Sequence, residues 1–318
     1  MTTEPTDLTG SPSLDAQEKN ITWQGLVHLM VIYVVWGSTY LGIRIAVREG
    51  AGFPPFIMGA MRTLVSGGLL LLLAVLLKRR VKLTKSEFIV LGVSGLLLWL
   101  GGHGMVVWAE QRTHSLFAAL ILGAEPIFVA LIEVILDRRL PSLTFILSLI
   151  IGFAGIAVLS APVLTSGITA DIISFAALLF AGISWGLGSI LQQRKPVNIS
   201  PTTSSGYQLL FGGLGLAVFA LLLREPMPTP TAEAWLAWLY LVIFGSLLAF
   251  TSYVKALQLL PISIVMTYPY VNPVIAIFLG WLILDEPVTF WTIAGAALVM
   301  LGVAGIFRTR QDSAQQKG

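Results

Sequence analysis

The sequence contains no cysteine and very little charge. Its 318 residues include 19 Lys and Arg, 16 Asp and Glu and three His, and only 11% of them are charged. Without cysteine there is no disulfide framework, thiolate metal site, cysteine nucleophile or iron–sulfur cluster. The three histidines, His28, His103 and His114, leave little for a zinc site. We therefore expect no metal and no cofactor.

The scarcity of charge also excludes broad classes of protein. A soluble domain carries about 25% charged residues, and this chain, which is 56% hydrophobic, could not cover its apolar surface in water. Disordered chains are polar and highly charged. A net charge of +3 gives no basic face for nucleic acid. The class that is left is a protein dissolved in a lipid bilayer.

Ten apolar segments are long enough to cross a membrane, which takes about 20 residues. Short connections rich in Gly and Pro separate them, such as Gly50–Pro55 and Pro196–Pro201. The sequence therefore predicts an all-α membrane protein with ten transmembrane helices. The predicted spans are 26–47, 56–77, 87–109, 114–136, 143–161, 171–192, 203–223, 234–257, 262–284 and 290–307. Residues 1–25, which do not resemble a cleavable signal peptide, and residues 308–318 are predicted polar tails.

The distribution of Lys and Arg predicts the orientation, because cytoplasmic loops of membrane proteins carry the excess of these residues. Arg44 and Arg62 lie within predicted spans. Arg48, Arg112 and Arg224 lie in loops on the side opposite the amino terminus. The remaining 14 of the 19 lie on the same side as the amino terminus. We therefore expect both tails in the cytoplasm and the protein in a bacterial inner (plasma) membrane.

The two halves of the chain resemble each other. Trp36-Gly37 recurs as Trp185-Gly186, at an offset of 149 residues. Further matches keep their order at offsets of 146 or 147, namely Gly67 with Gly213, Ala109 with Ala256, Pro126 with Pro273, and Gly155 with Gly302. Because a five-span repeat inserts its second copy upside down, we predict two inverted five-helix repeats, 26–161 and 171–307. Such a pair places a site at the repeat interface near the bilayer midplane and lets it open to either side in turn.

Several motifs resemble a known family. The first half carries Trp36-Gly37-Ser38-Thr39-Tyr40, Arg62, Gly102-His103-Gly104-Met105, Ala109-Glu110 and Glu125-Pro126. The second half carries Tyr268-Pro269-Tyr270-Val271-Asn272-Pro273-Val274 and Leu284-Asp285-Glu286-Pro287. On ten spans, this combination resembles the drug/metabolite transporter superfamily, EamA type, and within it the YedA-like group of exporters.

The resemblance implies a helical bundle whose central cavity is lined mainly by spans 1, 3, 4, 6, 8 and 9. It also implies efflux of metabolites, amino acids or drugs, coupled to protons or another gradient. After the fourth span the family often has a Glu-Arg-Leu-like turn, where this sequence has Asp137-Arg138-Arg139-Leu140. The substrates of the family are too varied for the resemblance to identify this one.

Glu125 is the most informative polar residue, because it lies near the middle of the fourth span. An ionised carboxylate at that depth costs about 2.5 kcal/mol or more, so it must face the interior, pair, or hold a proton. Its repeat mate is Asn272. One hypothesis is that Glu125 binds a substrate amine or a coupling proton. The alternative is a structural carboxylate tied to Arg62 or to a backbone group.

Arg62 and three prolines are the next candidates. Arg62, in the outer third of the second span, either gates the path and anchors an anionic group or forms a fixed ion pair that holds two spans together. Pro126, Pro269 and Pro273 are predicted to break the fourth and ninth spans at corresponding depths. Such breaks line the cavity of many transporters, although simple kinking for packing is the alternative.

The remaining candidates are mostly aromatic. The repeat mates Trp36 and Trp185 either stack on a substrate or pack against neighbouring helices. His103, surrounded by three glycines, is either a hydrogen-bonded structural residue or a proton relay. Tyr268 and Asn272, four residues apart, share one face of their helix. The candidate cavity residues are Trp36, Tyr40, His103, Glu125, Trp185, Tyr253, Tyr268 and Asn272.

The sequence thus predicts a secondary transporter, and not an enzyme, that exports small molecules by alternating access around a midplane cavity. An importer or a bidirectional facilitator is the alternative within that class. An intramembrane enzyme would need a nucleophile–base or metal set, and a non-transporting scaffold would leave the paired midplane breaks unexplained. The expected partners are a small-molecule substrate, the lipid bilayer and a coupling proton, with no nucleic acid, and the expected assembly is a monomer or a homodimer.

Overall fold

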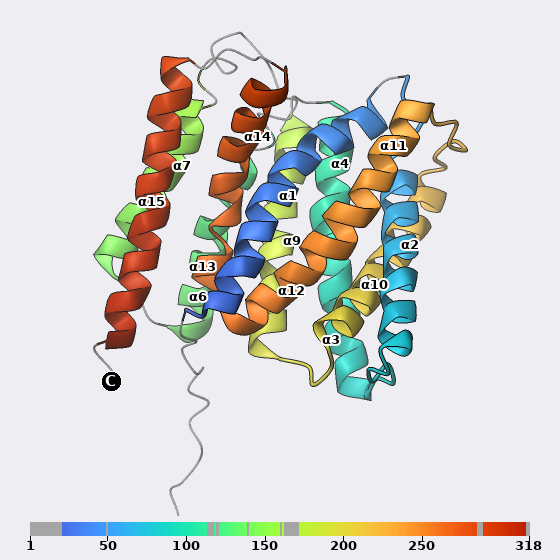
Figure 1. Cartoon of the computed structure of the whole chain (residues 1–318), viewed down its shortest axis with the longest axis horizontal. Helices are drawn as coiled ribbons and strands as arrows, with labels where there is room; N and C mark the ends of the chain where they lie inside the picture. Colours follow the sequence, from blue (N-terminus) through green and yellow to red (C-terminus); the bar gives the residue numbers. More distant parts are fainter. Residues whose placement is uncertain are drawn as a thin grey trace, which may run out of the picture.

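The computed structural model describes residues 21–48, 50–112, 118, 121–138, 140–159, 161, 172–284 and 289–315. Across these ranges the regular structure is helical, and the helices stand side by side in one bundle (Figure 1). Seven of the described helices are long and apolar enough to cross a membrane. Two shorter apolar helices and the described part of the fourth span complete the ten predicted spans. The chain is an all-α membrane protein of ten helices.

The first repeat contains the helices of the first five spans. They are α1 (Trp23–Val47), α2 (Pro55–Leu76), the third span of α3 (Lys85–Gly95), η1 (Leu96–Gly104) and α4 (Met105–Glu110), then α6 (Glu125–Asp137) and α7 (Leu143–Leu159). The second repeat follows the same order. Its helices are α9 (Ile172–Arg194), α10 (Pro201–Leu222), the eighth span of α11 (Ala232–Tyr240), η2 (Leu241–Leu248) and α12 (Ala249–Leu259), then α13 (Ile262–Val265) with α14 (Tyr268–Leu284), and α15 (Phe290–Gln315).

The two repeats are inverted relative to each other. Helix α1 and its repeat mate α9 cross the bundle in opposite directions (Figure 1). The third and eighth spans each contain a π-helical segment, η1 and η2. These two segments overlap when the sequence is shifted by the repeat offset. A π-helical turn is rare and is often found at a functional site, so its presence in both repeats marks the third and eighth spans as elements that shape the site.

The ends of the second and seventh spans also repeat. Lys78 and Arg224, which follow α2 and α10, both adopt a left-handed backbone, with φ of 53° and 52°. In each case the N–H of the next residue donates to the carbonyl five residues earlier, at 2.8 and 3.0 Å. This is the helix-ending motif that satisfies the last free carbonyl groups of a helix. The chain therefore turns out of the membrane in the same way in both halves.

Helix starts are fixed by side chains that accept from free N–H groups. Thr84 and Glu87 form a capping box at the start of α3, in which each side chain accepts from the other residue's backbone N–H. The Glu225 carboxylate accepts from the N–H groups of Phe56 and Ile57 at 3.1 and 2.8 Å. Glu225 belongs to the second repeat, so the first turn of α2 is capped from the other half of the molecule.

Glycine sets how closely the repeat mates pack. Helix α7 lies along α15, and α2 lies along α10. A Cβ atom at Gly302 would lie 2.5 Å from the backbone nitrogen of Gly152, and one at Gly155 would lie 2.6 Å from that of Val299. Neither distance leaves room for a side chain. Small residues drive helix association in lipid by such close approach, which explains why this pair of glycines recurs in both repeats.

The outside of the bundle is apolar. Leu76 is 69% exposed, Ile150 is 55% exposed and Leu221 is 78% exposed. In water these side chains would be an aggregation surface, whereas in a bilayer they face acyl chains. Residues 113–117, Arg139 and the Asp285-Glu286-Pro287 motif lie outside the described residues.

The close contact between α7 and α15 makes a prediction about stability. Gly302→Ala should destabilise the protein by about 1–3 kcal/mol, because the new methyl group meets backbone and the helices must separate. Gly68→Ala is the matched control, since a Cβ there meets nothing within 4 Å, and it should be neutral or stabilising by up to about 1 kcal/mol. Thermal unfolding in detergent measures both. Equal melting temperatures for the two variants would contradict the packing.

Candidate functional site

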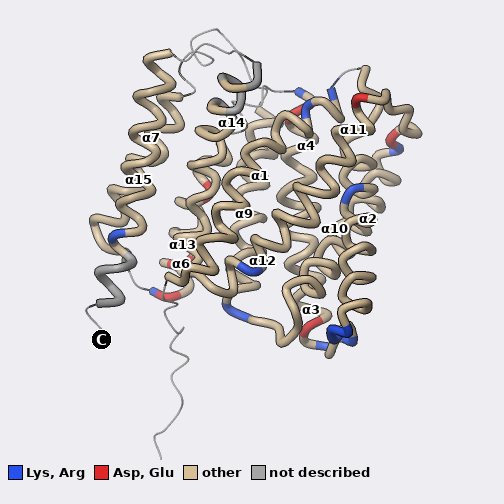
Figure 2. Tube along the Cα trace, viewed as in Figure 1, with Lys and Arg blue, Asp and Glu red and all other residues tan. Residues whose placement is uncertain are grey.

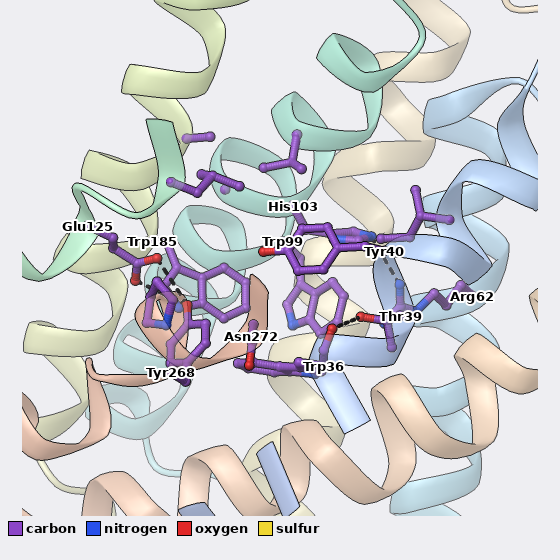
Figure 3. A pocket seen from close by; sticks show the side chains of 16 residues that line it. Trp36, Thr39, Tyr40, Arg62, Trp99, His103, Glu125, Trp185, Tyr268 and Asn272 are labelled. Atoms are coloured by element: carbon purple, nitrogen blue, oxygen red, sulfur yellow. Dashed lines mark hydrogen bonds between the residues drawn. The ribbon is translucent and has the colours of Figure 1, made fainter. Parts of the chain in front are cut away.

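A pocket of about 90 Å³ lies at the centre of the bundle, between helices of both repeats (Figure 3). Helices α1, α2, α6, α9 and α14 contribute to it together with the third span. Its lining residues are Trp36, Thr39, Tyr40, Ile43, Arg62, Trp99, Gly102, His103, Val106, Leu122, Glu125, Ala181, Trp185, Tyr268, Pro269 and Asn272. Nine of the residues singled out in the sequence are among them, although they come from spans far apart in the chain.

Aromatic rings form the walls. The Trp36 ring meets Trp185 edge-on at 5.5 Å between centroids and Tyr268 at 5.0 Å. Edge-to-face contacts of this kind add about 0.5–1.5 kcal/mol to simple burial. The indole Nε1 of Trp36 donates to the carbonyl oxygen of Gly245 at 3.1 Å. Because this bond crosses from α1 to the π-helical segment η2, it fixes the ring against the opposite repeat.

Glu125 stands at one side of the pocket as the first residue of α6, and it is 3% exposed. Its two carboxylate oxygens accept from the Tyr268 hydroxyl at 3.2 and 3.0 Å. Tyr268 is likewise the first residue of α14. Among the described residues, no cation lies within salt-bridge distance of Glu125. The carboxyl group therefore has a hydrogen-bond donor but no counter-charge.

Arg62 stands at the opposite side of the pocket (Figure 3), and no described residue forms the ion pair that was one of its two predicted roles. Its Nε donates to Ser246 Oγ at 2.8 Å, its Nη1 lies 3.2 Å from His103 Nε2, and its guanidinium carbon is 5.4 Å from the Trp99 ring centroid. Within the described chain Arg62 contacts no carboxylate. A hydroxyl, an imidazole and an aromatic face satisfy the guanidinium instead, and none of them neutralises it.

The contact with Arg62 also fixes the role of His103. A guanidinium can only donate, so the Nε2 atom of His103 must accept and cannot carry the proton in this arrangement. The imidazole is therefore a neutral acceptor on its pocket side. It also packs edge-on against Trp99, with ring centroids 5.2 Å apart. His103 thus has a structural hydrogen bond, and it lies on the wall of the pocket.

Asn272 and Tyr40 complete the polar part of the wall. With its nitrogen directed to two backbone carbonyls, the Asn272 amide donates to Tyr33 and Tyr268, each at 3.2 Å. Asn272 thereby connects α14 to α1 beside the pocket, so it has a structural role as well as a place in the lining. Tyr40 lines the same pocket from α1.

Three sequence candidates do not line this pocket. Tyr253 lies behind Trp36 and Trp185, with centroids 5.1 and 5.6 Å away, and is fully buried. Pro126 lies in the first turn of α6, where the missing N–H costs nothing. Pro273 lies inside α14, which continues to Leu284, so the expected break there is wrong. The ninth span is interrupted earlier, at 266–267, just before Tyr268 and Pro269.

Sequence reasoning missed three residues of interest. Thr39 and Trp99 line the pocket, and each has a sequence signal, because Thr39 is one turn after Trp36 and Trp99 is one turn before His103. Glu110, at the end of α4, buries both carboxylate oxygens with no hydrogen-bond partner among the described residues. Its signal was its place in the family motif.

The pocket extends toward one end of the bundle. From Trp36, the lining continues along α1 through Tyr40 to Ile43, and along the third span to Val106. In the other direction along α1, Tyr33 is buried and its hydroxyl bonds Thr267 Oγ1 at 2.5 Å. The pocket is therefore closed on the side where α1 begins and extends toward the side where α1 ends.

Ten membrane-spanning helices in inverted repeats around a central pocket define the class of membrane transporters. The chain belongs to the EamA-like transporter family, whose model matches residues 23–161 and again residues 172–308. This confirms the family that the motifs indicated and makes the chain a multi-pass membrane transporter. The double match also agrees with the repeat seen in the backbone.

Individual relatives carry similar names. The chain is 32% identical over 255 residues to the uncharacterised inner membrane transporter YedA of Escherichia coli K12, covering 79% of this chain and 80% of that protein. It is 21% identical to the uncharacterised transporter YoaV of Bacillus subtilis, covering 87% and 94% of the two chains. A solved crystal structure has the same fold, with a TM-score of 0.72 at 18% identity over 88% of this chain and 95% of that one.

The environment of Arg62 makes a second prediction about stability. Arg62→Lys keeps the charge but loses the planar fork that reaches Ser246 and His103 together. The variant should lose about 1–3 kcal/mol, the cost of leaving buried partners unsatisfied. Arg308→Lys, at an exposed position of α15, is the control and should melt like the wild type. If Arg62→Lys melts like the control in detergent, the hydrogen bonds of the buried guanidinium contribute nothing to stability.

Proposed function

We propose that the protein is a secondary transporter that moves a small amphipathic molecule through the central pocket by alternating access. The observation that carries this proposal is the Glu125 carboxyl group, which lines a membrane-embedded pocket with a tyrosine donor and no counter-charge among the described residues. An ionisable group at this depth is costly unless it has a function. A cationic ligand or a proton would supply the missing charge.

The walls of the pocket suggest the chemistry of the substrate. Aromatic faces attract a cation and cover an apolar body, and Trp36 and Trp185 present such faces beside Glu125. Arg62, on the other side, has no carboxylate partner in the described part of the chain and would favour an anionic or strongly polar end. An amino acid, an amine metabolite or an amphipathic drug has these features. If the substrate is a small metabolite without an amine, Glu125 would bind a coupling proton instead of the substrate.

We propose that the orientation places both ends of the chain in the cytoplasm. Figure 2 supports this, because Lys and Arg gather at the end of the bundle where the carboxyl terminus lies. In this orientation the side toward which the pocket extends is the outer one, so the structure corresponds to an outward-open or occluded state. The cell membrane that holds the protein would be the bacterial inner membrane.

Export is the direction that we propose, on the strength of the family resemblance. Import and bidirectional facilitation use the same pocket and are distinguished only by transport measurements. No ATP-binding motif occurs in the sequence, so the driving force would be an ion gradient or the substrate gradient itself. Glu125 is the residue that we assign to coupling, and Arg62 the one that we assign to gating or anion binding.

The role of Glu125 is tested by transport in proteoliposomes. Counterflow with labelled amino acids and cationic drugs should identify a transported compound, and Glu125→Gln should lower its rate at least about tenfold, the effect of losing one charge-assisted contact. The wild type should respond to an imposed proton gradient and Glu125→Gln should not. Glu233→Gln, an exposed carboxylate paired with Arg48, is the control. Unchanged rate and pH response in Glu125→Gln would contradict the assignment.

The orientation is tested by reporter fusions at Lys82 and Pro228. Lys82 lies between α2 and α3, and Pro228 lies between α10 and α11. An odd number of spans separates these two loops, so a cytoplasm-active and a periplasm-active reporter should give opposite results at the two sites. Lys82 should report the cytoplasm. The same result at both sites would overturn the orientation and the inverted repeat together.

A further inference from the structure

A second cavity, of about 150 Å³, lies between α3, α9, α10 and α12. Its walls include Val90, Leu91, Gln192, Gln193, Val254 and Leu257. It is large enough for several water molecules. The cavity lies toward the end of the bundle where α9 ends and α3 begins, which is opposite to the side toward which the central pocket extends.

The same helix faces line both cavities in turn. On α9, Trp185 lines the central pocket, Ser189 follows one turn later, and Gln192 and Gln193 line the second cavity one turn further on. Residues spaced in this way share one face of a helix. The third span behaves likewise, because Leu91 lines the second cavity and Trp99 lines the central pocket. The two cavities therefore lie along one line through the bundle.

A barrier centred on Tyr253 separates them. The Tyr253 hydroxyl accepts from Trp185 Nε1 at 3.0 Å and hydrogen-bonds with Ser189 Oγ. Its ring packs against Trp36 and Phe250, and it belongs to the same buried hydrophobic cluster as Leu98. The next residue along the chain, Val254, already lines the second cavity. The Tyr253 hydroxyl on α12 thus joins α12 to α9 between the two cavities, and the path between the cavities is closed there.

We propose that the second cavity is the cytoplasmic chamber of the transport path, a second station for the transported molecule, and that the Tyr253 hydroxyl is the latch between the chamber and the central pocket. This inference rests on the proposed function. Breaking the bonds to Trp185 and Ser189 frees α9 from α12 and joins the two spaces. The latch holds the path closed on the cytoplasmic side while the central pocket is open on the other.

The chemistry of the chamber differs from that of the central pocket. Its polar residues are mainly amides, Gln192, Gln193 and Gln258, with Lys195 at the rim and no carboxylate in the lining. Such walls hydrogen-bond a polar group of the substrate, but the described lining residues offer no counter-charge to an amine. A cationic substrate therefore gains its counter-charge only when it reaches Glu125. The chamber admits or releases the molecule, and the central pocket selects it.

The absence of cysteine makes the path directly measurable. Thr39→Cys places one thiol on the central pocket, and Gln258→Cys places one on the chamber. A membrane-impermeant methanethiosulfonate is applied to right-side-out or inside-out vesicles. Cys at 39 should react from the outer face, and Cys at 258 from the cytoplasmic face. Labelling of both from the same face would overturn the chamber.

The latch is tested in the Thr39→Cys background. Tyr253→Phe removes the hydroxyl but keeps the ring, and it should raise labelling of the thiol from the cytoplasmic face about tenfold, the shift expected from two lost hydrogen bonds. Tyr270→Phe is the matched control, because its buried hydroxyl bonds Leu149 at 2.9 Å away from both cavities. It should leave the labelling unchanged. Equal labelling in the two variants would overturn the latch.

Ser189→Ala provides a second approach if Tyr253→Phe does not fold. It removes the other hydroxyl of the latch and should raise cytoplasmic labelling in the same direction by a smaller factor, and an unchanged rate would count against the latch. The labelling needs no substrate. If the cysteines behave as expected but no compound shows counterflow, the proposed transport fails and the gated path stands. If counterflow occurs and the labelling is insensitive to Tyr253, the latch fails and transport stands.

Discussion

The free-energy cost of an unsatisfied polar group in hydrocarbon determines how the backbone and the buried polar side chains of this molecule are arranged. Lipid offers no hydrogen-bond partner in the bilayer core, so backbone groups pair within helices and most buried polar side chains take a partner from the protein. Thr39 and Ser66 return their hydroxyls to carbonyls of their own helices, at 2.8 and 2.7 Å. Arg62 instead forms hydrogen bonds with Ser246 and His103, which belong to two other spans. Arg62 thereby links three spans at the central pocket.

The inverted repeat supplies a symmetric frame, and the pocket departs from that symmetry. Glycine contacts, helix ends and π-helical segments recur in both halves, and they determine where the helices stand. The aromatic pair Trp36 and Trp185 recurs at the site, but its charged residues do not, because Glu125 corresponds to Asn272 and Arg62 to Gln208. Gln208 donates to Ser94 at 2.7 Å much as Arg62 donates to Ser246. One repeat thus carries the charges at the site, while the other carries amides at the equivalent places.

The sequence predicted the spans, the repeat and most of the pocket lining, because length, hydropathy and offset are local or periodic properties. It did not predict the partners. That Tyr268 donates to Glu125, or that Arg62 lies between Ser246 and His103, depends on the crossing of helices whose contacting residues are 41 to 184 positions apart in the chain. The break expected at Pro273 was misplaced for a related reason. A proline is compatible with the start of a helix, but the packing of neighbouring helices determines where the helix starts, and here it starts at Tyr268. The π-helical segments have no pattern that hydropathy detects.

The positions of Glu125 and Tyr268 link binding to movement. Glu125 and Tyr268 are each the first residue of a helix that restarts within the membrane, and α14 packs along α1. On the proposed function, an amine that pairs with Glu125 competes with the Tyr268 hydroxyl for the same oxygens. Releasing that hydroxyl loosens α14, and with it the aromatic cluster in which Tyr268 meets Trp36 and Tyr253. The proposed latch residue, Tyr253, belongs to that cluster. Binding in the central pocket and opening of the cytoplasmic barrier would therefore both move the rings of Trp36, Tyr253 and Tyr268.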